Sequence, residues 1–123
     1  MQDEPTPTEL IKAVADFLRN EITPVIKGHN AFKLRVSINA LDLVTRQLAL
    51  ADEGDAAEAA RLKHLLGSDG SLVELNRALS EKIASGEVDL NTPGLSEHLW
   101  QTTMAKLAVD QPNYASYKRE LDT

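Results

Sequence analysis

The residues from Asn30 to Ala51 form the stretch that most constrains how this chain can fold. Placed on a helix at about 100° per residue, its apolar side chains are spread around most of the helix circumference. They are Leu34, Val36, Ile38, Ala40, Leu41, Val44 and Leu48. A helix that is apolar on nearly every side is normally surrounded by other helices. The stretch therefore predicts the central helix of a bundle, from about residue 30 to residue 52.

The remaining sequence carries helix-capping signals and no convincing strand pattern. Thr6–Glu9 and Ser71–Glu74 both place a hydroxyl at the N-cap and a glutamate three residues later. Thr92–Pro93 repeats a cap residue followed by a first-turn proline. Gly54 is expected to end the central helix in the left-handed conformation, with a third helix starting at Asp55. These signals predict an all-α fold, a single-domain helical bundle of five main helices plus a short C-terminal helix.

The first residues and the chain length suggest a simple domain organisation. Residues 1–5 are expected to form a disordered leader, and residues 6–123 a single helical domain. The acidic start MQDEP does not resemble a signal peptide, and no apolar run reaches the roughly 20 residues needed to cross a bilayer. The sequence therefore favours a cytoplasmic protein.

The composition argues against several classes of function. The chain has no cysteine, which excludes disulfides, thiolate catalysis and thiolate metal sites. Its 19 acidic and 13 basic residues give a formal charge of −6, opposite in sign to that of a typical nucleic-acid-binding protein. The same charge disfavours an anionic membrane surface. We therefore expect neither nucleic acid nor a membrane as a partner.

No catalytic constellation can be assembled from local motifs. The three histidines lie in different segments, without the i, i+3 or i, i+4 spacing of a helical metal site. No nucleophile elbow and no glycine-rich phosphate loop is present. Ser71 follows Asp69 and Gly70, which breaks the Asp-Ser-Leu signature of acyl carrier proteins, and it is explained as a helix N-cap. The sequence thus predicts no catalytic residue, no metal site and no cofactor, and it favours a protein that is not an enzyme.

One polar strip interrupts the apolar surface of the central helix. It consists of Arg35, Asn39, Asp42 and Arg46, at spacings i, i+4, i+7 and i+11. The two guanidinium groups, oriented by Asn39 and Asp42, are suited to bind a carboxylate or a phosphate. The alternative is a solvated helix face, or a ridge paired with acidic residues of neighbouring helices. The strip is a candidate ligand site or interface, and Tyr114 is a further candidate through its hydroxyl.

Three stretches that together span most of the chain carry a family resemblance. They are PTPTELIKAVADFLRNEITP, FKLRVSINALDLVTRQL and KLAVDQPNYASY. They resemble an uncharacterised bacterial family of small helical proteins, a domain of unknown function. The resemblance implies that members are often encoded beside aminoglycoside-phosphotransferase-like kinases and acyl-CoA dehydrogenase-like enzymes. It also implies that the family pattern includes Arg35, Asn39, Arg46, Pro112 and Tyr114.

The sequence supports two hypotheses of function. The first is an accessory or protein-interaction domain, linked through the resemblance to acyl-CoA metabolism, that binds a protein partner or forms an oligomer through a helix face. The second is a binding protein for a small anionic ligand, an acyl-CoA or a phosphate ester. In that hypothesis Arg35 and Arg46 hold the anion, and Asn39 orients it by hydrogen bonding.

Overall fold

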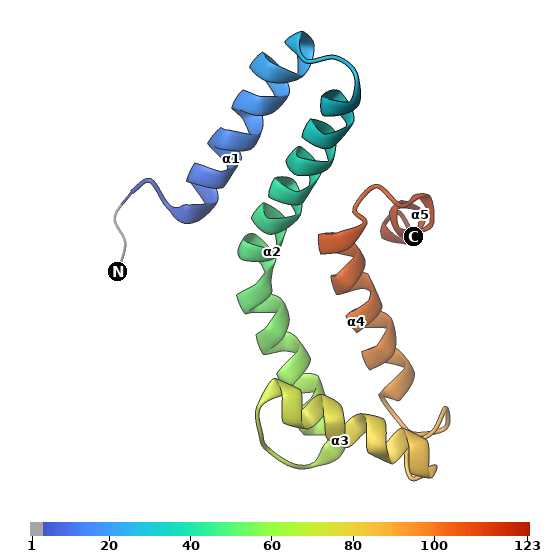
Figure 1. Ribbon diagram of the computed structural model, residues 1–123. Coiled ribbons are helices and arrows are strands. Elements are labelled where there is room, and N and C mark those ends of the chain that lie inside the picture. Colours follow the sequence, from blue (N-terminus) through green and yellow to red (C-terminus); the bar gives the residue numbers. More distant parts are fainter. Residues whose placement is uncertain (1–3) are drawn as a thin grey trace. The chain divides into compact units, whose positions relative to one another are not determined.

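A computed structural model describes residues 4–123, and every regular element in this range is a helix (Figure 1). The α-helices are α1 (Pro7–Phe17), α2 (His29–Leu66), α3 (Leu72–Ser85), α4 (Leu95–Asp110) and α5 (Ala115–Leu121). A π-helical turn, η1 (Leu18–Ile22), and a 3-10 turn, η2 (Thr23–Val25), follow α1. The all-α fold predicted from the sequence is confirmed.

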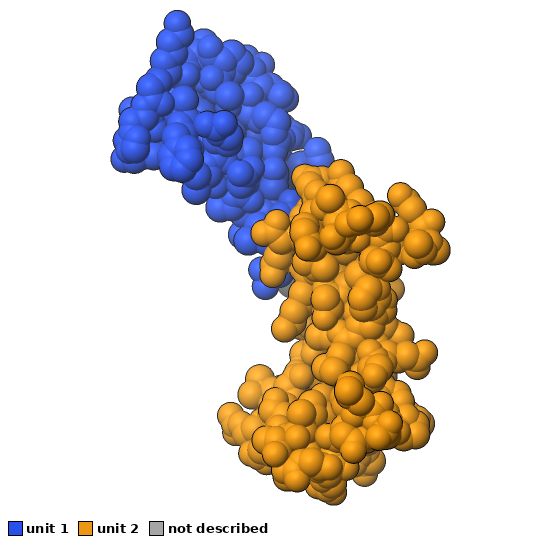
Figure 2. Space-filling model, turned by 90° about the vertical axis from the view of Figure 1, so that its right-hand side faces the viewer, with its two compact units in different colours: residues 1–50 blue, residues 51–123 orange. Residues whose placement is uncertain are grey.

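The chain divides into two compact units, unit 1 (residues 1–50) and unit 2 (residues 51–123), which Figure 2 shows in different colours. Helix α2 contributes residues to both units. The leader predicted at residues 1–5 lies partly outside the described residues, and within it Glu4 and Pro5 are exposed. The single domain predicted for residues 6–123 stays a prediction, because two units that share a helix can belong to one domain.

Unit 1 is a helical hairpin, in which α1 and the first part of α2 run side by side in opposite directions (Figure 1). Helix α1 begins as predicted. Thr6 is its N-cap, and the Thr6 hydroxyl accepts a hydrogen bond from the Glu9 N–H at 3.2 Å. Among the described residues of this unit, the buried apolar side chains are Ala15 on α1 and Ile38 on α2. The core of the hairpin is therefore small.

Unit 2 contains a larger apolar core. Leu62 on α2 is fully buried against Leu75, Leu79, Val88 and Leu95, with Leu66 and Leu72 packed at the edge. Helix α3 begins as predicted, since the Ser71 hydroxyl accepts a hydrogen bond from the Glu74 N–H at 3.1 Å. It ends at Gly86, whose φ of 82° is the left-handed conformation that glycine adopts without steric cost.

The predicted end of the central helix at about residue 52 is wrong. Helix α2 runs without a break from His29 to Leu66, a length of 38 residues, so the predicted second and third helices are one element. Gly54 lies inside α2 and does not take a positive φ. A glycine inside a helix costs about 1 kcal/mol relative to alanine, and the alanine-rich sequence after it favours continuation. The helix stops instead at Gly67, which has a φ of 64°.

The predicted start of the next helix also needs correction. Thr92 does not cap α4, because the N-cap is Gly94 with a φ of 88°. The Thr92 hydroxyl accepts a hydrogen bond from the Asp89 N–H at 2.9 Å and so closes the preceding turn. A threonine before a proline suits either arrangement, and the glycine that follows decides between them.

Neighbouring helices do not cover α2 on nearly every side, contrary to the expectation from its apolar pattern. Ile38 is buried, but Val36, Val44 and Leu48 are each between 41% and 51% exposed. In unit 1 a single helix packs against α2, and one neighbour can cover only one side of a helix. Helix α2 thus carries more apolar side chains in unit 1 than the hairpin itself buries.

Substitution by alanine should have opposite effects on stability at Gly54, inside α2, and at Gly86, at the end of α3. Gly54→Ala should stabilise the chain by about 0.5–1 kcal/mol, because an added Cβ meets nothing within 4 Å and the helix gains a better former. Gly86→Ala should destabilise it, because its φ of 82° strains any other residue. Urea unfolding followed by circular dichroism measures both. A destabilising Gly54→Ala would place the helix end back at Gly54.

Candidate functional site

The polar strip predicted on the central helix lies on α2 within unit 1. Arg35 and Asn39 are exposed, whereas Asp42 and Arg46 are half-buried. In the described part of the chain, the side chains of Arg35 and Asn39 have no hydrogen bond or ion pair. The four residues thus share one stretch of helix but differ in their surroundings.

Asp42 is held by a residue that the sequence did not single out. The Arg19 guanidinium on η1 donates a hydrogen bond of 2.6 Å to the Asp42 carboxylate and one of 3.0 Å to Asp16. Lys12 also pairs with Asp16, at 3.1 Å. The hydrogen bond and charge of Asp42 raise the pKa of Arg19 further above its ordinary value. This network ties η1 to α2 along one side of the hairpin.

The Arg19–Asp42 pair changes what the strip can do chemically. A carboxylate that accepts a short hydrogen bond from a guanidinium is partly neutralised. Asp42 is therefore less able to compete with an external anion for the arginines of the strip. Surface ion pairs contribute little to stability, so the main effect of the contact is on the register of the hairpin and on the local charge.

Tyr114 belongs to unit 2, where it is the N-cap of α5 and about half exposed. Its backbone N–H donates to the Gln111 carbonyl at 3.0 Å, which forms the turn between α4 and α5. The polar strip belongs to unit 1. The structure therefore brings Arg35, Asn39, Asp42 and Arg46 together on one helix and places Tyr114 in the other unit.

Unit 2 contains a second polar cluster, between α2 and α4. Arg61 on α2 donates through Nε to His98 Nδ1 at 3.2 Å and through Nη2 to the Thr102 hydroxyl at 3.3 Å. His98 is only 2% exposed. One turn before Arg61, the Glu58 carboxylate accepts a hydrogen bond of 3.3 Å from the side-chain amide of Asn76 on α3. The cluster joins three helices of this unit.

The hydrogen bond from Arg61 fixes the protonation state of His98. A guanidinium has only donors, so Nδ1 must be the unprotonated acceptor and the neutral ring carries its proton on Nε2. Burial lowers the pKa of His98 and the charge of Arg61 lowers it further, with Glu58 acting in the opposite direction. His98 is therefore held neutral, and its Nδ1 is not free to accept a proton from a substrate.

Sequence reasoning missed this cluster, although each half has a local signal. Glu58 and Arg61 are spaced i, i+3, and His98 and Thr102 are spaced i, i+4, so each pair shares a helix face. Their pairing across helices depends on tertiary packing, which spacing along one helix does not reveal. Among residues 4–123, no group of three His, Asp or Glu is close enough together to hold a metal ion.

The pKa of His98 predicts how stability depends on pH. The unfolded chain takes up a proton near the ordinary histidine pKa of about 6.5, whereas the folded chain does so only at lower pH. The contribution of His98 to the free energy of unfolding should therefore be fully present above the unfolded pKa of about 6.5. It should decrease as the pH falls below about 6.5 and level off once the pH is below the pKa of His98 in the folded chain. Melting temperatures between pH 8 and pH 5 measure the effect.

His98→Asn is the matched control for that pH profile, because it keeps an acceptor near the position of Nδ1 but does not titrate. The variant should lose part of the decrease in melting temperature at acidic pH. If the wild-type and variant profiles ran parallel over the whole range, the buried neutral histidine would be the wrong explanation.

Comparison with known proteins gives one match. The pattern of a protein family described as a domain of unknown function (DUF6285) covers residues 24–114. No curated protein and no solved structure matches the chain. In residues 4–123, no helix has both the length and the apolar character needed to span a membrane.

Proposed function

Because this chain belongs to the family described as a domain of unknown function (DUF6285), its role has to follow from its own surface, and we propose that it is a non-enzymatic accessory protein. It binds a protein partner, or a second copy of itself, through an exposed apolar face of the hairpin in unit 1. The proposal places it in the bacterial cytoplasm, and nucleic acid is not among its partners.

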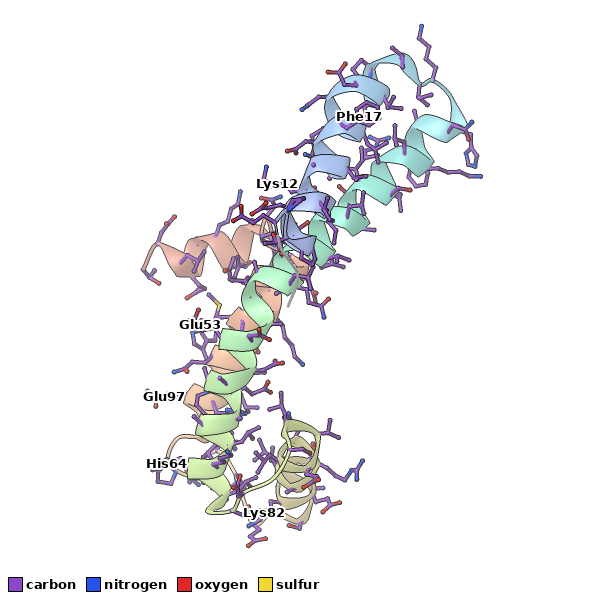
Figure 3. All side chains as sticks on the ribbon, turned by 90° about the vertical axis from the view of Figure 1, so that its left-hand side faces the viewer. Lys12, Phe17, Glu53, His64, Lys82 and Glu97 are labelled. Atoms are coloured by element: carbon purple, nitrogen blue, oxygen red, sulfur yellow. The ribbon has the colours of Figure 1, made fainter. Side chains whose placement is uncertain are left out.

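The observation that carries the proposal is a set of large apolar side chains that unit 1 leaves uncovered. They lie at i, i+4 and i+7 on α1 and at i and i+4 on α2, and each is between 41% and 54% exposed. The residues, together called the apolar face, are Leu10, Val14, Phe17, Val44 and Leu48. Phe17 is labelled on α1 in Figure 3, with Lys12 of the polar network on the same helix.

The buried residues of the hairpin, taken with the Arg19–Asp42 ion pair, indicate that these side chains share one side of it. Arg19 follows Leu10 by nine positions, about two and a half helical turns, and therefore lies roughly opposite to it around α1. Val44 follows Asp42 by two positions, about 200° around α2. Ala15 and Ile38 are buried and mark the sides by which α1 and α2 face each other. Arg19 and Asp42 each follow one of them by four positions, about 40° around the helix, and because the two helices are antiparallel both lie at the same edge of this contact, where they form their ion pair. Leu10 and Val44, roughly opposite to them, therefore both lie toward the other edge.

A contiguous apolar surface of this kind is a characteristic of a binding site. Single exposed apolar residues are normal, but large contiguous patches on a soluble protein mark interaction surfaces. The resemblance described above adds candidates for the partner, namely acyl-CoA dehydrogenase-like and aminoglycoside-phosphotransferase-like enzymes. A role in acyl-CoA metabolism would then be exerted through such an enzyme.

Binding of a partner enzyme should depend on the apolar face. Val14→Glu places a charge at a half-exposed position, where it does not disturb the small core but cannot be buried against a partner. It should weaken binding to a purified candidate enzyme by at least about tenfold, since an unpaired buried charge costs more than 1.4 kcal/mol. Isothermal titration calorimetry measures the affinity.

Val73→Glu is the control for that experiment, because Val73 is 68% exposed on α3 and belongs to unit 2, whereas the apolar face belongs to unit 1. Its affinity for the enzyme should equal that of the wild type. Equal weakening by both variants, or a strictly monomeric chain that binds none of the candidate enzymes, would contradict the proposal.

A second candidate function is the binding of a small anion, an acyl-CoA or a phosphate ester, on the polar strip. The specific observation in its favour is that Arg35 and Asn39 are exposed, with no side-chain hydrogen bond in the described residues, while Arg19 partly neutralises Asp42. Arg46 lies on the same strip, and two guanidinium groups suit a phosphate.

The ligand hypothesis predicts thermal stabilisation by anionic ligands. The melting temperature should rise with the concentration of an acyl-CoA or a phosphate ester, as mass action requires. The rise should disappear in Arg35→Ala and Arg46→Ala and persist in Arg77→Ala, since Arg77 is an exposed arginine on α3. The absence of any shift across a panel of such ligands would exclude this candidate.

A further inference from the structure

We infer that the partner of the apolar face is a second copy of this chain, and that two hairpins pair to form a four-helix bundle with two-fold symmetry. The inference rests on the proposed function, because it assigns an occupant to the same apolar face. Each copy would contribute α1 and the unit 1 part of α2.

The first observation is the incomplete core of the hairpin. In the described residues of unit 1, Ala15 and Ile38 are the buried apolar side chains, whereas five apolar residues form the buried core of unit 2. Two amphipathic helices alone cannot cover each other's apolar surface, and antiparallel helices commonly complete their core in bundles of four. The hairpin therefore lacks the two helices that a second copy would supply.

The second observation is the area of the apolar face. Its five residues are about half exposed. Burying a Val, Leu or Phe side chain fully is worth about 1.5–3 kcal/mol at about 25 cal/mol per Å², which corresponds to roughly 60–120 Å² of apolar area. Together the five side chains therefore leave on the order of 200 Å² uncovered per copy. A standard interface buries about 800 Å² per partner, of which roughly 60% is apolar. The face thus supplies close to half of the apolar area that such an interface needs.

The third observation is that the face is complementary to itself. A two-fold interface sets one surface against an identical one, so charges in its centre would repel each other. The five residues are apolar, and Ser37, Ala40 and Leu41, which lie on the same side of α2, are uncharged. Lys33 on that side lies toward the loop end of the hairpin, where the polar rim of an interface belongs.

The ion pairs of the hairpin also support pairing of two copies through the apolar face. The Arg19–Asp42 pair and the Lys12–Asp16 pair are satisfied within one chain. Because the Arg19–Asp42 contact lies on the side away from the apolar face, pairing of the two faces leaves it in water. Dimer formation then costs no desolvation of that pair.

The first test is the mass of the full-length chain in solution. Light scattering after size exclusion should give twice the 13.5 kDa of one chain at concentrations on the order of tens of micromolar. Val14→Glu and Val44→Glu, one on each helix, should each raise the dimer dissociation constant by at least about tenfold. Val73→Glu should leave it unchanged. Circular dichroism confirms that each variant is folded.

The second test uses the absence of cysteine in the natural chain. A single Val14→Cys or Val44→Cys variant carries one thiol near the centre of the apolar face. A short bis-maleimide should convert each variant to a covalent dimer at concentrations where Val73→Cys stays monomeric. The crosslinked Val14→Cys dimer should melt at a higher temperature than the untreated variant, because the link removes the entropy cost of association.

A monomer at all concentrations, with equal crosslinking of all three cysteine variants, would overturn the inference. If such a monomer still bound a candidate enzyme and Val14→Glu weakened that binding, the occupant would be a different protein and the proposed function would stand. If the monomer bound no enzyme, both would fail. A dimer that the glutamate substitutions do not weaken would place the interface elsewhere and likewise overturn the inference.

Discussion

The packing of α2 against its neighbours is the interaction on which both units depend. In unit 1 it buries Ile38, and in unit 2 it buries Leu62 at the centre of the largest core. The polar contacts between helices use the same element, since Asp42 and Arg61 both lie on α2. A helix of 38 residues is long enough to pack against the helices of both units. If the helix were broken at Gly54, each of the two shorter helices would need its own packing contacts to be held in place.

The two units use α2 differently, and this difference bears on function. Unit 2 surrounds Leu62 with α3, the following loop and α4, so this residue of α2 is fully buried within the chain. Unit 1 offers a single neighbouring helix and leaves Val44 and Leu48 about half exposed. Apolar surface that folding does not cover is available for association. The interaction function that we propose therefore rests on the hairpin, and the buried Arg61–His98 contact is understood as part of the structure of unit 2.

The candidate site was predictable in part. Helix periodicity placed Arg35, Asn39, Asp42 and Arg46 on one strip, because that requires only the geometry of one helix. It could not identify Arg19 as the partner of Asp42, since their contact depends on how η1 meets α2. The spacing of His98 and Thr102 indicated a shared helix face, but it could not indicate that Arg61, 37 residues away, pairs with His98. Contacts between helices are decided by packing, which spacing along the chain does not encode.

The sequence by itself determined that the chain is helical and where α1 and α3 begin, because a hydroxyl N-cap with a glutamate three residues later acts within a single turn. It did not determine whether Gly54 would end a helix, since the cost of a glycine is small enough for neighbouring residues to outweigh. The tertiary structure alone decided which apolar residues are buried. Val44 and Ile38 are equally apolar in the sequence, yet only the side of α2 that faces another helix loses its contact with water.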